Sequence, residues 1–442
     1  GRDYIDRAVR AGAAALCVSR GGESRHDRIV VDETRRSLGR LAASVHGDPS
    51  HDLAVIGVTG TNGKTTVTHF VESILQSLGM PVGLIGTIGS RVGDTALPSV
   101  RTTPEASDFQ RLLANMRDAA VSHVAVEVSS HALELHRVDG TRFVAAGFTN
   151  LSQDHLDFHG SMELYEAAKR RLFRDFEIGT AVINLDDPVG RSIASSYGRE
   201  MMTVGDGGDF SFEIISRSAT GTTFVLRTPD IEATVSAPVV GEFNVSNVTM
   251  AIALCAASGV GSASLVASLE GLRPVPGRFE VVSRPDEPTV VVDYAHTPEG
   301  ISSAIEVARE ISEARVLAVF GAGGDRDRAK RPMMGRAGSA ADVAIVTSDN
   351  PRSESPEDIV SQVLAGASAE ARAVVDRREA IEAAIAESRS GDVVLILGKG
   401  HETGQEHRGV VTPFDDREVA RAALNSWRKS ANFDADSGSM GL

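Results

Sequence analysis

The chain contains very little cysteine, which limits how its fold can be held together. Cys17 and Cys255 lie far apart in a sequence of 442 residues, so they predict neither a disulfide framework nor a zinc cluster. We expect both to be small buried apolar residues. Long apolar runs are also absent, and without one the sequence excludes a membrane-spanning protein.

Positive charge is scarce as well. The sequence has 45 Lys and Arg against 60 Asp and Glu, a formal net charge of −15. A field of this sign repels nucleic acid unless a basic stripe overrides it, and the sequence has none of useful length. We therefore expect no nucleic-acid partner, and small anionic substrates would need local cationic pockets. The chain begins at Gly1 with no secretory signal pattern, so the expected location is the cytoplasm.

The length and the pattern of strands and helices predict a multidomain α/β protein. A first alternating region predicts a parallel sheet, with strands near 53–58, 124–128, 145–149 and 181–184 and a helix near 161–173. The Gly- and Pro-bearing stretch 272–277 is predicted to be a linker. A second region follows, with strands near 289–292, 316–320, 343–347 and 393–397. The predicted domains are a central parallel-sheet α/β domain at 51–277 and a Rossmann-like α/β domain at 278–442.

The two ends of the chain carry weaker signals. Residues 1–50 include a strand-like run at 15–18 but too few elements for a domain of normal size, so we expect a partial N-terminal α/β domain there. The tail from Lys429 is rich in Ser, Asp and Gly and is predicted to be disordered.

A glycine-rich turn lies between a predicted strand and a predicted helix that runs to Leu78. It consists of Thr59-Gly60-Thr61-Asn62-Gly63-Lys64-Thr65-Thr66. In such a turn backbone N–H groups bind a phosphate, a lysine neutralises the outer phosphates, and a Thr hydroxyl reaches Mg²⁺. Either Thr65 or Thr66 could supply that hydroxyl. The spacing departs from the strict P-loop pattern because Val58 stands five residues before Gly63. The alternative is a plain turn that caps a helix, although Lys64 adds a charge that such a turn does not need.

The segment Gly60 to Thr65 resembles the ATP loop of the Mur ligases and of the related folylpolyglutamate synthetases. Further segments between about residue 50 and residue 425 resemble the Mur ligases in the same order: 102–104, 127–131, 150–157, 165–169, 277–280 and 293–296. Asp349-Asn350-Pro351-Arg352 and Gly398-Lys399-Gly400-His401-Glu402 resemble the amino-acid pocket of members that add the third residue of the peptide stem.

This resemblance implies an ATP-dependent peptide synthetase of peptidoglycan biosynthesis, with a central P-loop-type ATPase domain at 51–277 and an amino-acid-binding domain at 278–442. Such an enzyme activates a carboxylate as an acyl phosphate, joins it to an amine, and releases ADP and phosphate. The implied partners are UDP-N-acetylmuramoyl-L-alanyl-D-glutamate and meso-diaminopimelate, with ATP and Mg²⁺, and the expected state is a monomer. Domain closure over ATP is expected about the linker. Only the last part of the family's uridine-recognising domain is expected, in residues 1–18.

The resemblance also implies a catalytic and metal-binding set of Lys64, Glu127, His155 and Lys169. Glu127 ends an apolar strand, where ligand crevices form, and would hold the Mg²⁺ that Thr65 also touches. His155 would bind a second metal ion. In related ligases the lysine at the place of Lys169 is carbamylated by CO₂, which requires a neutral amine and hence a lowered pKa. The alternatives are a solvated strand-end Glu127, a helix-capping His155 and a solvated Lys169.

Three ligand-binding sets follow from the same resemblance. ATP is expected between the two domains, bound by Gly60, Thr61, Asn62, Gly63, Lys64, Thr65, Thr66, Asn247, Arg278, Asp293 and His296. The muramoyl-dipeptide is expected at Thr102, Thr103, Ser129 and Arg137. Diaminopimelate is expected at Arg326, Asp349, Asn350, Pro351, Arg352, Gly398 and Glu402. The alternatives are helix caps for Asn244 and Asn247, and ordinary loop ion pairs for Arg326 and Arg352.

Arg352 determines the predicted amine. Its planar fork suits a bidentate contact with a carboxylate, and meso-diaminopimelate has a second carboxylate that lysine lacks. Members with arginine at this place typically add diaminopimelate. The alternatives are a lysine-adding relative and an inactive nucleotide-binding fragment. A hydrolase built on Ser130 and His131 is disfavoured, because adjacent residues on an extended segment would point to opposite sides.

Overall fold

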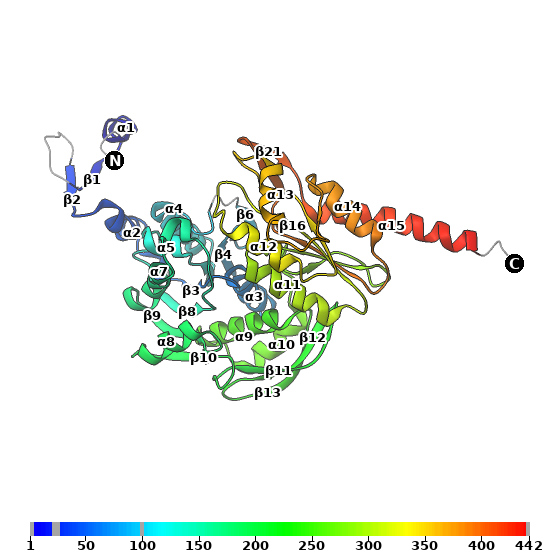
Figure 1. Cartoon of the computed structure of the whole chain (residues 1–442). Coiled ribbons are helices and arrows are strands. Elements are labelled where there is room, and N and C mark those ends of the chain that lie inside the picture. The colour runs from blue at the N-terminus through cyan, green and yellow to red at the C-terminus, as the bar shows by residue number, and fades with distance from the viewer. Residues whose placement is uncertain (1–3, 20–26, 98–100, 439–442) are drawn as a thin grey trace.

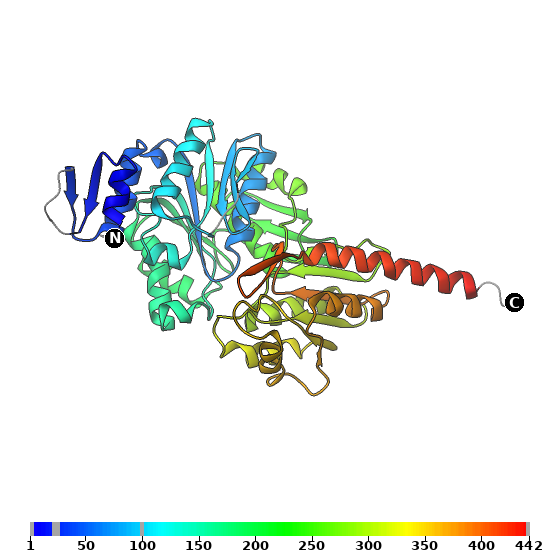
Figure 2. The same cartoon turned by 90° about the horizontal axis from the view of Figure 1, so that it is seen from above.

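The computed structural model describes residues 4–19, 27–97 and 101–438. Figure 1 shows two layered α/β regions joined side by side, with a small antiparallel sheet beneath the first of them. The first described helix and the last lie at opposite ends of the molecule in both views (Figures 1 and 2). Among the described residues no helix is both long and apolar enough to cross a bilayer.

The central domain is built on an eight-stranded sheet, in the order β10-β9-β8-β3-β7-β4-β5-β6. The six strands from β10 to β4 are parallel, whereas β5 and β6 add an antiparallel edge. The strands are β3 Ala54–Thr59, β4 Val82–Gly86, β5 Gly89–Val92, β6 Thr95–Leu97, β7 His123–Glu127, β8 Phe143–Phe148, β9 Ile178–Asn184 and β10 Met201–Val204. Each predicted strand of this region overlaps an observed one, and the predicted parallel sheet is confirmed.

Helices cover both faces of this sheet because its parallel strands are apolar on both sides. One core includes side chains of α3 Lys64–Ser77 and α9 Glu242–Ala257. The other includes side chains of α4 Ala106–Asp118 and α7 Met162–Asp175. Shorter helices complete the domain: α5 Ser130–Glu134, α6 Leu156–His159, α8 Pro188–Ser196 and α10 Ser262–Ser268, with 3₁₀ turns Pro49–His51 and Leu269–Gly271.

A three-stranded antiparallel sheet was missed by the sequence analysis. It consists of β11 Ser211–Ser218, β12 Gly221–Arg227 and β13 Glu232–Ala237. Its middle strand alternates buried and half-buried residues, which is the signature of a strand with one face on a core. Phe224 and Leu226 on that face join the same core as α3 and α9.

The C-terminal domain contains a six-stranded sheet in the order β14-β15-β19-β16-β17-β18. Only β14 runs antiparallel to its neighbour. The strands are β14 Glu280–Val281, β15 Thr289–Asp293, β16 Val316–Phe320, β17 Val343–Val346, β18 Arg372–Ala373 and β19 Val393–Leu397. Helices α11 Pro298–Ile311, α12 Lys330–Gly338 and α13 Pro356–Leu364 contribute to one core, and α14 Arg377–Glu387 and α15 Asp416–Gly438 to the other. The predicted second α/β region is confirmed.

The N-terminal segment contains α1 Ile5–Arg10, β1 Ala15–Val18, β2 Asp27–Val30 and α2 Thr34–Val45. Its two strands pair in parallel, and β2 is exposed along its whole length. Cys17 on β1 is half-buried whereas Cys255 is buried, and both are free thiols. The expectation that Cys17 is buried is therefore wrong, because a two-stranded sheet cannot cover both of its faces. The predicted domain boundaries after residues 50 and 277 stay predictions.

The predicted disorder of the tail is wrong for residues 429–438. Helix α15 continues to Gly438, and Figure 2 shows it extending well away from the sheet. A helix that already has a packed first half extends at little cost, and this stretch has no proline to stop it. Residues 439–442 lie outside the described chain, as do residues 1–3 of the segment that resembles the family's first domain.

The linker at 272–277 runs without regular structure from the central domain to β14. At its end Gly277 has a φ of 64°, and a Cβ there would lie 2.1 Å from the backbone nitrogen of His401. The linker thus packs against the loop that follows β19. Its glycine permits this close approach between the two domains.

Candidate active site

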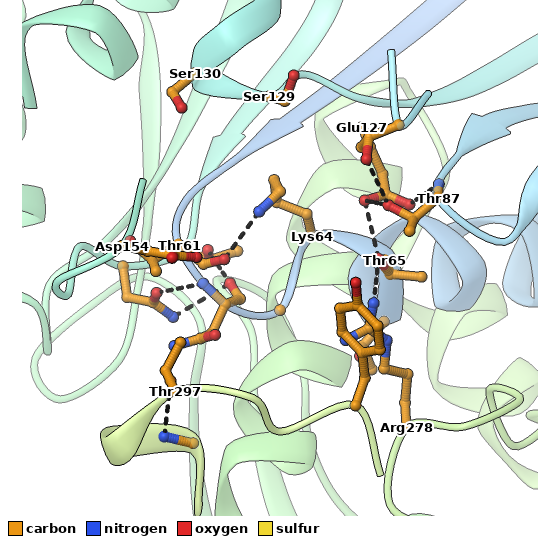
Figure 3. A pocket seen from close by; sticks show the side chains of 18 of the residues that line it. Thr61, Lys64, Thr65, Thr87, Glu127, Ser129, Ser130, Asp154, Arg278 and Thr297 are labelled. Carbon is orange, nitrogen blue, oxygen red and sulfur yellow. Dashed lines mark hydrogen bonds between the residues drawn. The ribbon is translucent and has the colours of Figure 1, made fainter. Parts of the chain in front are cut away.

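A cavity of about 640 Å³ is lined by residues of both domains. Its walls come from the loop after β3, from the ends of β7 and β8, from α9, and from the start of the C-terminal domain (Figure 3). The carboxyl ends of parallel strands are where ligand crevices form in open α/β sheets. The proposed ATP residues Thr61 to Thr66, Asn247, Arg278, Asp293 and His296 all line this cavity.

The glycine loop after β3 is shaped by close packing against the loop after β8. Gly60 has a φ of 150°, and a Cβ there would lie 1.8 Å from Thr149 Oγ1. Gly63 has a φ of 86°, and its Cβ would lie 2.5 Å from Asn247 Oδ1. The backbone N–H of Asn62 donates to Asn150 Oδ1 at 2.9 Å. The two glycines are therefore required by conformation and by space.

Lys64 begins α3, where a helix N-terminus favours an anion. Its Nζ donates to the carbonyl oxygens of Gly60 and Thr61, both at 2.9 Å. Burial lowers the pKa of Lys64, while the negative charge of Glu127 acts in the opposite direction. The lysine thus lines the cavity but is folded onto its own loop, from which a bound phosphate could draw it.

Lys169 on α7 is fully enclosed, with a relative exposure of 1%. Its Nζ donates to Gly60 O at 2.6 Å and lies 4.5 Å from the centre of the Tyr165 ring. Burial lowers the pKa of Lys169 well below its usual value, and the nearby charge of Lys64 lowers it further. The alternative of a solvated lysine is wrong. Two ammonium groups converge on the same carbonyl, which favours the neutral amine at Lys169.

Glu127 is the last residue of β7 and has no exposed surface, so the alternative of a solvated strand end is wrong. Its Oε2 accepts from Thr65 Oγ1 at 2.9 Å and from Thr87 Oγ1 at 3.0 Å. The backbone N–H of Thr87 donates to Oε1 at 2.7 Å, and Arg278 Nη2 donates to Thr65 Oγ1 at 3.0 Å. These residues lie in the right half of Figure 3. Sequence reasoning missed Thr87, which belongs to no recognisable motif.

The oxygen atoms of Thr65 and Glu127 fit one magnesium ion. Mg²⁺ usually binds one or two protein oxygens and completes its shell with waters and substrate phosphates. A dedicated cage of side chains is therefore not required, and within the described residues no three His, Cys, Asp or Glu side chains form one. Thr66 also lines the cavity, but the contact with Glu127 comes from Thr65.

His155 stands at the start of α6 with a φ of 54°. It is the N-cap residue of that helix, and its backbone oxygen accepts from the N–H groups of Phe158 at 3.1 Å and His159 at 3.0 Å. The helix-capping alternative thus holds for its backbone, whereas its side chain makes no cap. Burial lowers the pKa of His155 to about 3, which keeps the imidazole neutral at physiological pH. Neutral imidazole is the form that binds metal ions.

Ser130 does not lie on an extended segment, contrary to the sequence-based expectation. It is the first residue of α5, and Ser129 caps that helix by accepting from the backbone N–H of Ala132 at 3.1 Å. The hydrogen-bond partner of Ser130 Oγ is His159 Nε2 at 3.0 Å. The neighbouring ring of His131 instead stacks on Phe158, with centroids 4.1 Å apart. The segment is helical rather than extended because the side chain of Ser129 caps its first turn.

The residues predicted to bind the muramoyl-dipeptide lie together on one wall of the cavity. Thr103 Oγ1 donates to Glu127 O at 2.7 Å and accepts from the backbone N–H of Ser129 at 3.2 Å. Arg137 Nη1 donates to Thr103 O at 3.3 Å. Thr102, the fourth member, lines the same wall.

Three arginines surround Glu105 beside this wall. Arg137 pairs with Glu105 at 3.0 Å, Arg101 at 2.6 Å and Arg35 at 3.2 Å. Arg101 and Arg137 line the cavity. Such a cluster carries more positive than negative charge and suits an anionic group. Sequence reasoning missed Arg35 and Arg101, because the partners of Glu105 are spread along the chain.

Arg278, Asp293 and His296 form the junction between the domains. The guanidinium of Arg278 lies 4.4 Å from the centre of the Tyr294 ring. Asp293 accepts from the backbone N–H groups of Phe279 at 2.6 Å and Ala295 at 2.8 Å, and burial raises its pKa. Asp293 therefore shapes the junction as well as lining the cavity.

Asp154 of the central domain contacts the C-terminal domain across the cavity. Its Oδ1 accepts from Lys330 Nζ on α12 at 2.7 Å, and its Oδ2 lies 4.0 Å from His296 Nε2. Burial alone would raise the pKa of Asp154, but His155, His296 and Lys330 bring it below its usual value. Lys330 was not singled out from the sequence.

Asn247 lies inside α9, whose N-cap residue is Gly241, so the helix-cap alternative is wrong for it. Its side chain faces the phosphate loop near Gly63. Asn244, one turn earlier, donates through Nδ2 to Val240 O at 2.9 Å. Its side chain thus binds the residue that directly precedes the N-cap residue of the helix.

The predicted amino-acid residues divide into two groups. Arg326 lines the main cavity. The others lie in two contacting loops, where Asn350 Nδ2 donates to Glu402 Oε2 at 2.8 Å and a Cβ on Gly398 would lie 2.5 Å from Asp349 Oδ2. Arg352 adopts a φ of 51°, donates to Gly324 O at 2.7 Å and lies 3.6 Å from Glu406 Oε2. Pro351 carries the turn between Asn350 and Arg352.

Comparisons with known proteins agree with this architecture. Residues 58–255 match the Mur ligase middle domain, and residues 277–400 match the family named Mur ligase, glutamate ligase domain. The UDP-N-acetylmuramoyl-L-alanyl-D-glutamate--2,6-diaminopimelate ligase of Geobacillus thermodenitrificans is 44% identical, over 97% of this chain and 90% of that protein. The ligase of the same name from Aquifex aeolicus is 43% identical, over 96% of this chain and 88% of that protein.

Solved structures show the same relationship. A structure named UDP-N-acetylmuramoyl-L-alanyl-D-glutamate--2,6-diaminopimelate ligase has a TM-score of 0.69 at 33% identity and covers 97% of this chain and 90% of its own. MurF ligase from Thermotoga maritima, in complex with ADP, has a TM-score of 0.68 at 19% identity, over 97% of this chain and 92% of its own, and so shows the fold alone. The fold and the phosphate loop define an ATP-dependent acid–amino-acid ligase. The chain belongs to the Mur ligase family, whose ligases act in peptidoglycan synthesis.

Proposed function

We propose that this ligase joins meso-diaminopimelate to UDP-N-acetylmuramoyl-L-alanyl-D-glutamate. The observation that carries the proposal is Arg352, held in a left-handed turn beside the loop of Glu402. A guanidinium there suits the second carboxylate of diaminopimelate, and a carboxylate suits an ammonium group. The names of the relatives, which include diaminopimelate, support the same amine.

The chemistry begins with two anions that repel each other, the substrate carboxylate and the triphosphate of ATP. The N–H groups of the glycine loop and the helix dipole of α3 would bind the phosphates. Lys64 would leave the carbonyls of Gly60 and Thr61 and donate to the outer phosphates. Transfer of the γ-phosphoryl group to the carboxylate gives an acyl phosphate and ADP. The amine of diaminopimelate then attacks the acyl carbon, and phosphate leaves.

Mg²⁺, when bound, would neutralise charge between carboxylate and phosphates. We propose Thr65 and Glu127 for one ion, and His155 with a carbamylated Lys169 for a second. The lowered pKa of Lys169 supports its carbamylation, since CO₂ reacts with the neutral amine. A Lys169→Ala variant should lose most of its activity and regain part of it with added short carboxylates. Full activity of the variant, or a loss of activity that short carboxylates do not restore, would contradict the carbamate.

The remaining contacts follow from the walls of the cavity. We propose that Thr102, Thr103, Ser129 and Arg137 bind the muramoyl-dipeptide, with the arginines around Glu105 attracting its phosphates. Arg326, with Asp349, Asn350, Pro351, Gly398 and Glu402, would hold the amino-acid end. We further propose that the enzyme works as a monomer and in the cytoplasm. A cytoplasmic location suits a reaction between ATP and a nucleotide-linked substrate.

The direct test is phosphate release from ATP with the muramoyl-dipeptide nucleotide, Mg²⁺ and either meso-diaminopimelate or L-lysine. Product mass identifies the bond formed. We expect release that depends on diaminopimelate. Release with lysine alone would retain the ligase and overturn the amine specificity. Release with neither amine would overturn the proposed reaction.

A further inference from the structure

A buried ion pair lies beneath the two loops of the amino-acid site and outside the main cavity. Arg377, the first residue of α14, binds Asp416, the first residue of α15, through Nε–Oδ1 at 2.8 Å and Nη2–Oδ2 at 2.6 Å. Both side chains have no exposed surface. Desolvation makes such a pair a poor source of stability compared with apolar side chains of similar size. Stability alone therefore does not explain what it contributes.

The remaining contacts of Arg377 point to its role. Its Nη2 donates to Leu397 O at 3.0 Å and its Nη1 to Ser348 O at 3.4 Å. Leu397 immediately precedes Gly398, and Ser348 immediately precedes Asp349. One guanidinium thus bonds to the residue before each of the two loops.

The order of strands shows why this link matters. One loop follows β17 and the other follows β19, and β16 lies between these two strands in the sheet. β17 and β19 are therefore not paired with each other by backbone hydrogen bonds within the sheet. The planar, rigid fork of Arg377 instead reaches a carbonyl beside each loop, and Asp416 fixes the orientation of the fork.

A second buried cation joins the same loops closer to their tips. Lys399 has no exposed surface, and its Nζ donates to Asn350 Oδ1 at 3.1 Å, Glu402 Oε2 at 2.8 Å and Gly404 O at 2.7 Å. The two segments also contact each other directly, since the backbone N–H of Arg352 donates to Glu406 O at 3.0 Å and Gln405 Nε2 donates to Asp349 O at 2.6 Å. These links lie nearer the loop tips, and the bonds of Arg377 lie nearer the strands. Lys399 acts on residues proposed to touch the amino acid, whereas Arg377 acts only on the loop bases.

We propose that Arg377 and Asp416 form a positioning pair that sets the spacing of the two loops and thereby the affinity for the incoming amino acid. The pair touches neither substrate nor nucleotide. The proposal rests on the proposed function only in taking these loops as the amino-acid site. Its effect should be confined to the amine, because the phosphate loop is built on a different sheet.

The test compares steady-state kinetics of the full chain with Arg377→Lys, which keeps the charge but loses the fork. We expect KM for meso-diaminopimelate to rise about tenfold or more, since small misplacements of binding groups cost this much. KM for ATP and for the muramoyl-dipeptide nucleotide should stay within about twofold of wild type. The matched control is Arg315→Lys, because Arg315 pairs bidentately with Asp392 and donates to Glu387 O at the amino ends of the strands, whereas the two loops lie at the carboxyl ends. It should leave all three KM values unchanged.

A second variant covers the case in which Arg377→Lys fails to fold. The double variant Arg377→Met with Asp416→Leu replaces the pair by apolar side chains of similar size, an exchange that buried pairs often tolerate. It should fold, with thermal unfolding close to wild type, and show the same selective rise in KM for the amine. An unchanged KM for the amine, an equal rise in all three KM values, or loss of the fold in both variants would overturn the positioning role.

The wild-type chain separates this proposal from the proposed function. A wild type that uses lysine instead of diaminopimelate overturns the amine specificity, and a selective rise in KM for lysine in the variants then still supports the positioning pair. A wild type that uses diaminopimelate, with variants that keep its KM, overturns the positioning pair alone. A wild type inactive with both amines overturns the two together.

Discussion

The phosphate loop follows the carboxyl end of a strand in the central sheet, and the amino-acid site follows the carboxyl ends of two strands in the C-terminal sheet. The two sites are built in different ways. The phosphate loop is a single run from Gly60 to Thr66 between one strand and one helix. The amino-acid site combines two loops from strands that are not neighbours, and buried Arg377 and Lys399 hold those loops together. A site from one continuous segment is determined by local sequence. A site from two segments depends on residues that never touch the ligand.

The largest effect is expected for Lys64, the residue proposed to bind the phosphates of ATP. Lys64→Gln should lower kcat by about 10²- to 10³-fold, the usual loss when a donor to developing charge is removed. The loop should keep its shape, since its glycines pack against Thr149 and Asn247. Phosphate release measures the change, and the exposed Lys429→Gln is the control. A Lys64→Gln enzyme with near-normal kcat would contradict the proposed role of Lys64 in binding the phosphates.

A smaller and more selective effect is expected in the assembled site. Arg352→Lys should raise KM for diaminopimelate by about tenfold while KM for ATP stays the same, because lysine cannot reproduce a bidentate contact with a carboxylate. The arginine of the exposed pair Arg372–Glu387 offers the matched control, Arg372→Lys. A parallel rise in KM for ATP would mean that the two regions are not independent, contrary to the comparison.

The smallest effect is expected for the contact between Lys330 and Asp154, which links the two domains. Lys330→Met removes the contact of α12 with Asp154 and should lower kcat by about threefold, roughly 0.7 kcal/mol, because His296 stays 4.0 Å from Asp154 and keeps part of the link between the domains. The unfolding temperature should change little. Titration of ATP binding by fluorescence would show whether closure is weakened. A loss as large as that of Lys64→Gln would instead place Lys330 on the reacting atoms.

Sequence reasoning placed Glu127 correctly, because it ends an apolar run and the parallel sheet then determines which edge it occupies. Its role at that edge stays a prediction. Pattern alone does not reveal exposure that depends on a distant partner. Lys169 has the pattern of a solvated helical lysine and was singled out only through the family resemblance, yet the turn of Gly60 lies over it. Arg377 and Asp416 stand 39 residues apart with no shared motif, so only the folded chain reveals their contact.

Two of the errors concern whole elements, the missed β11–β13 sheet and the helical tail. The β11–β13 sheet carries alternating burial along β12, but the sequence analysis predicted no strand between residues 184 and 289 and so did not use that alternation. The helical tail reflects propagation from packed residues of α15, such as Ala420 and Leu424, rather than the composition of the tail itself.

The shared carbonyl of Gly60 has a consequence for chemical probes. Burial lowers the pKa of both Lys64 and Lys169, and both lysines line the cavity. Amines react with electrophiles only when unprotonated, and ordinary surface lysines are protonated at neutral pH. An aldehyde or sulfonyl fluoride attached to an adenine-like scaffold would therefore capture Lys169 in the fraction of enzyme that is not carbamylated, and CO₂ should compete with the label. Saturating ATP should also protect this lysine, so labelling with and without nucleotide would report occupancy of the pocket.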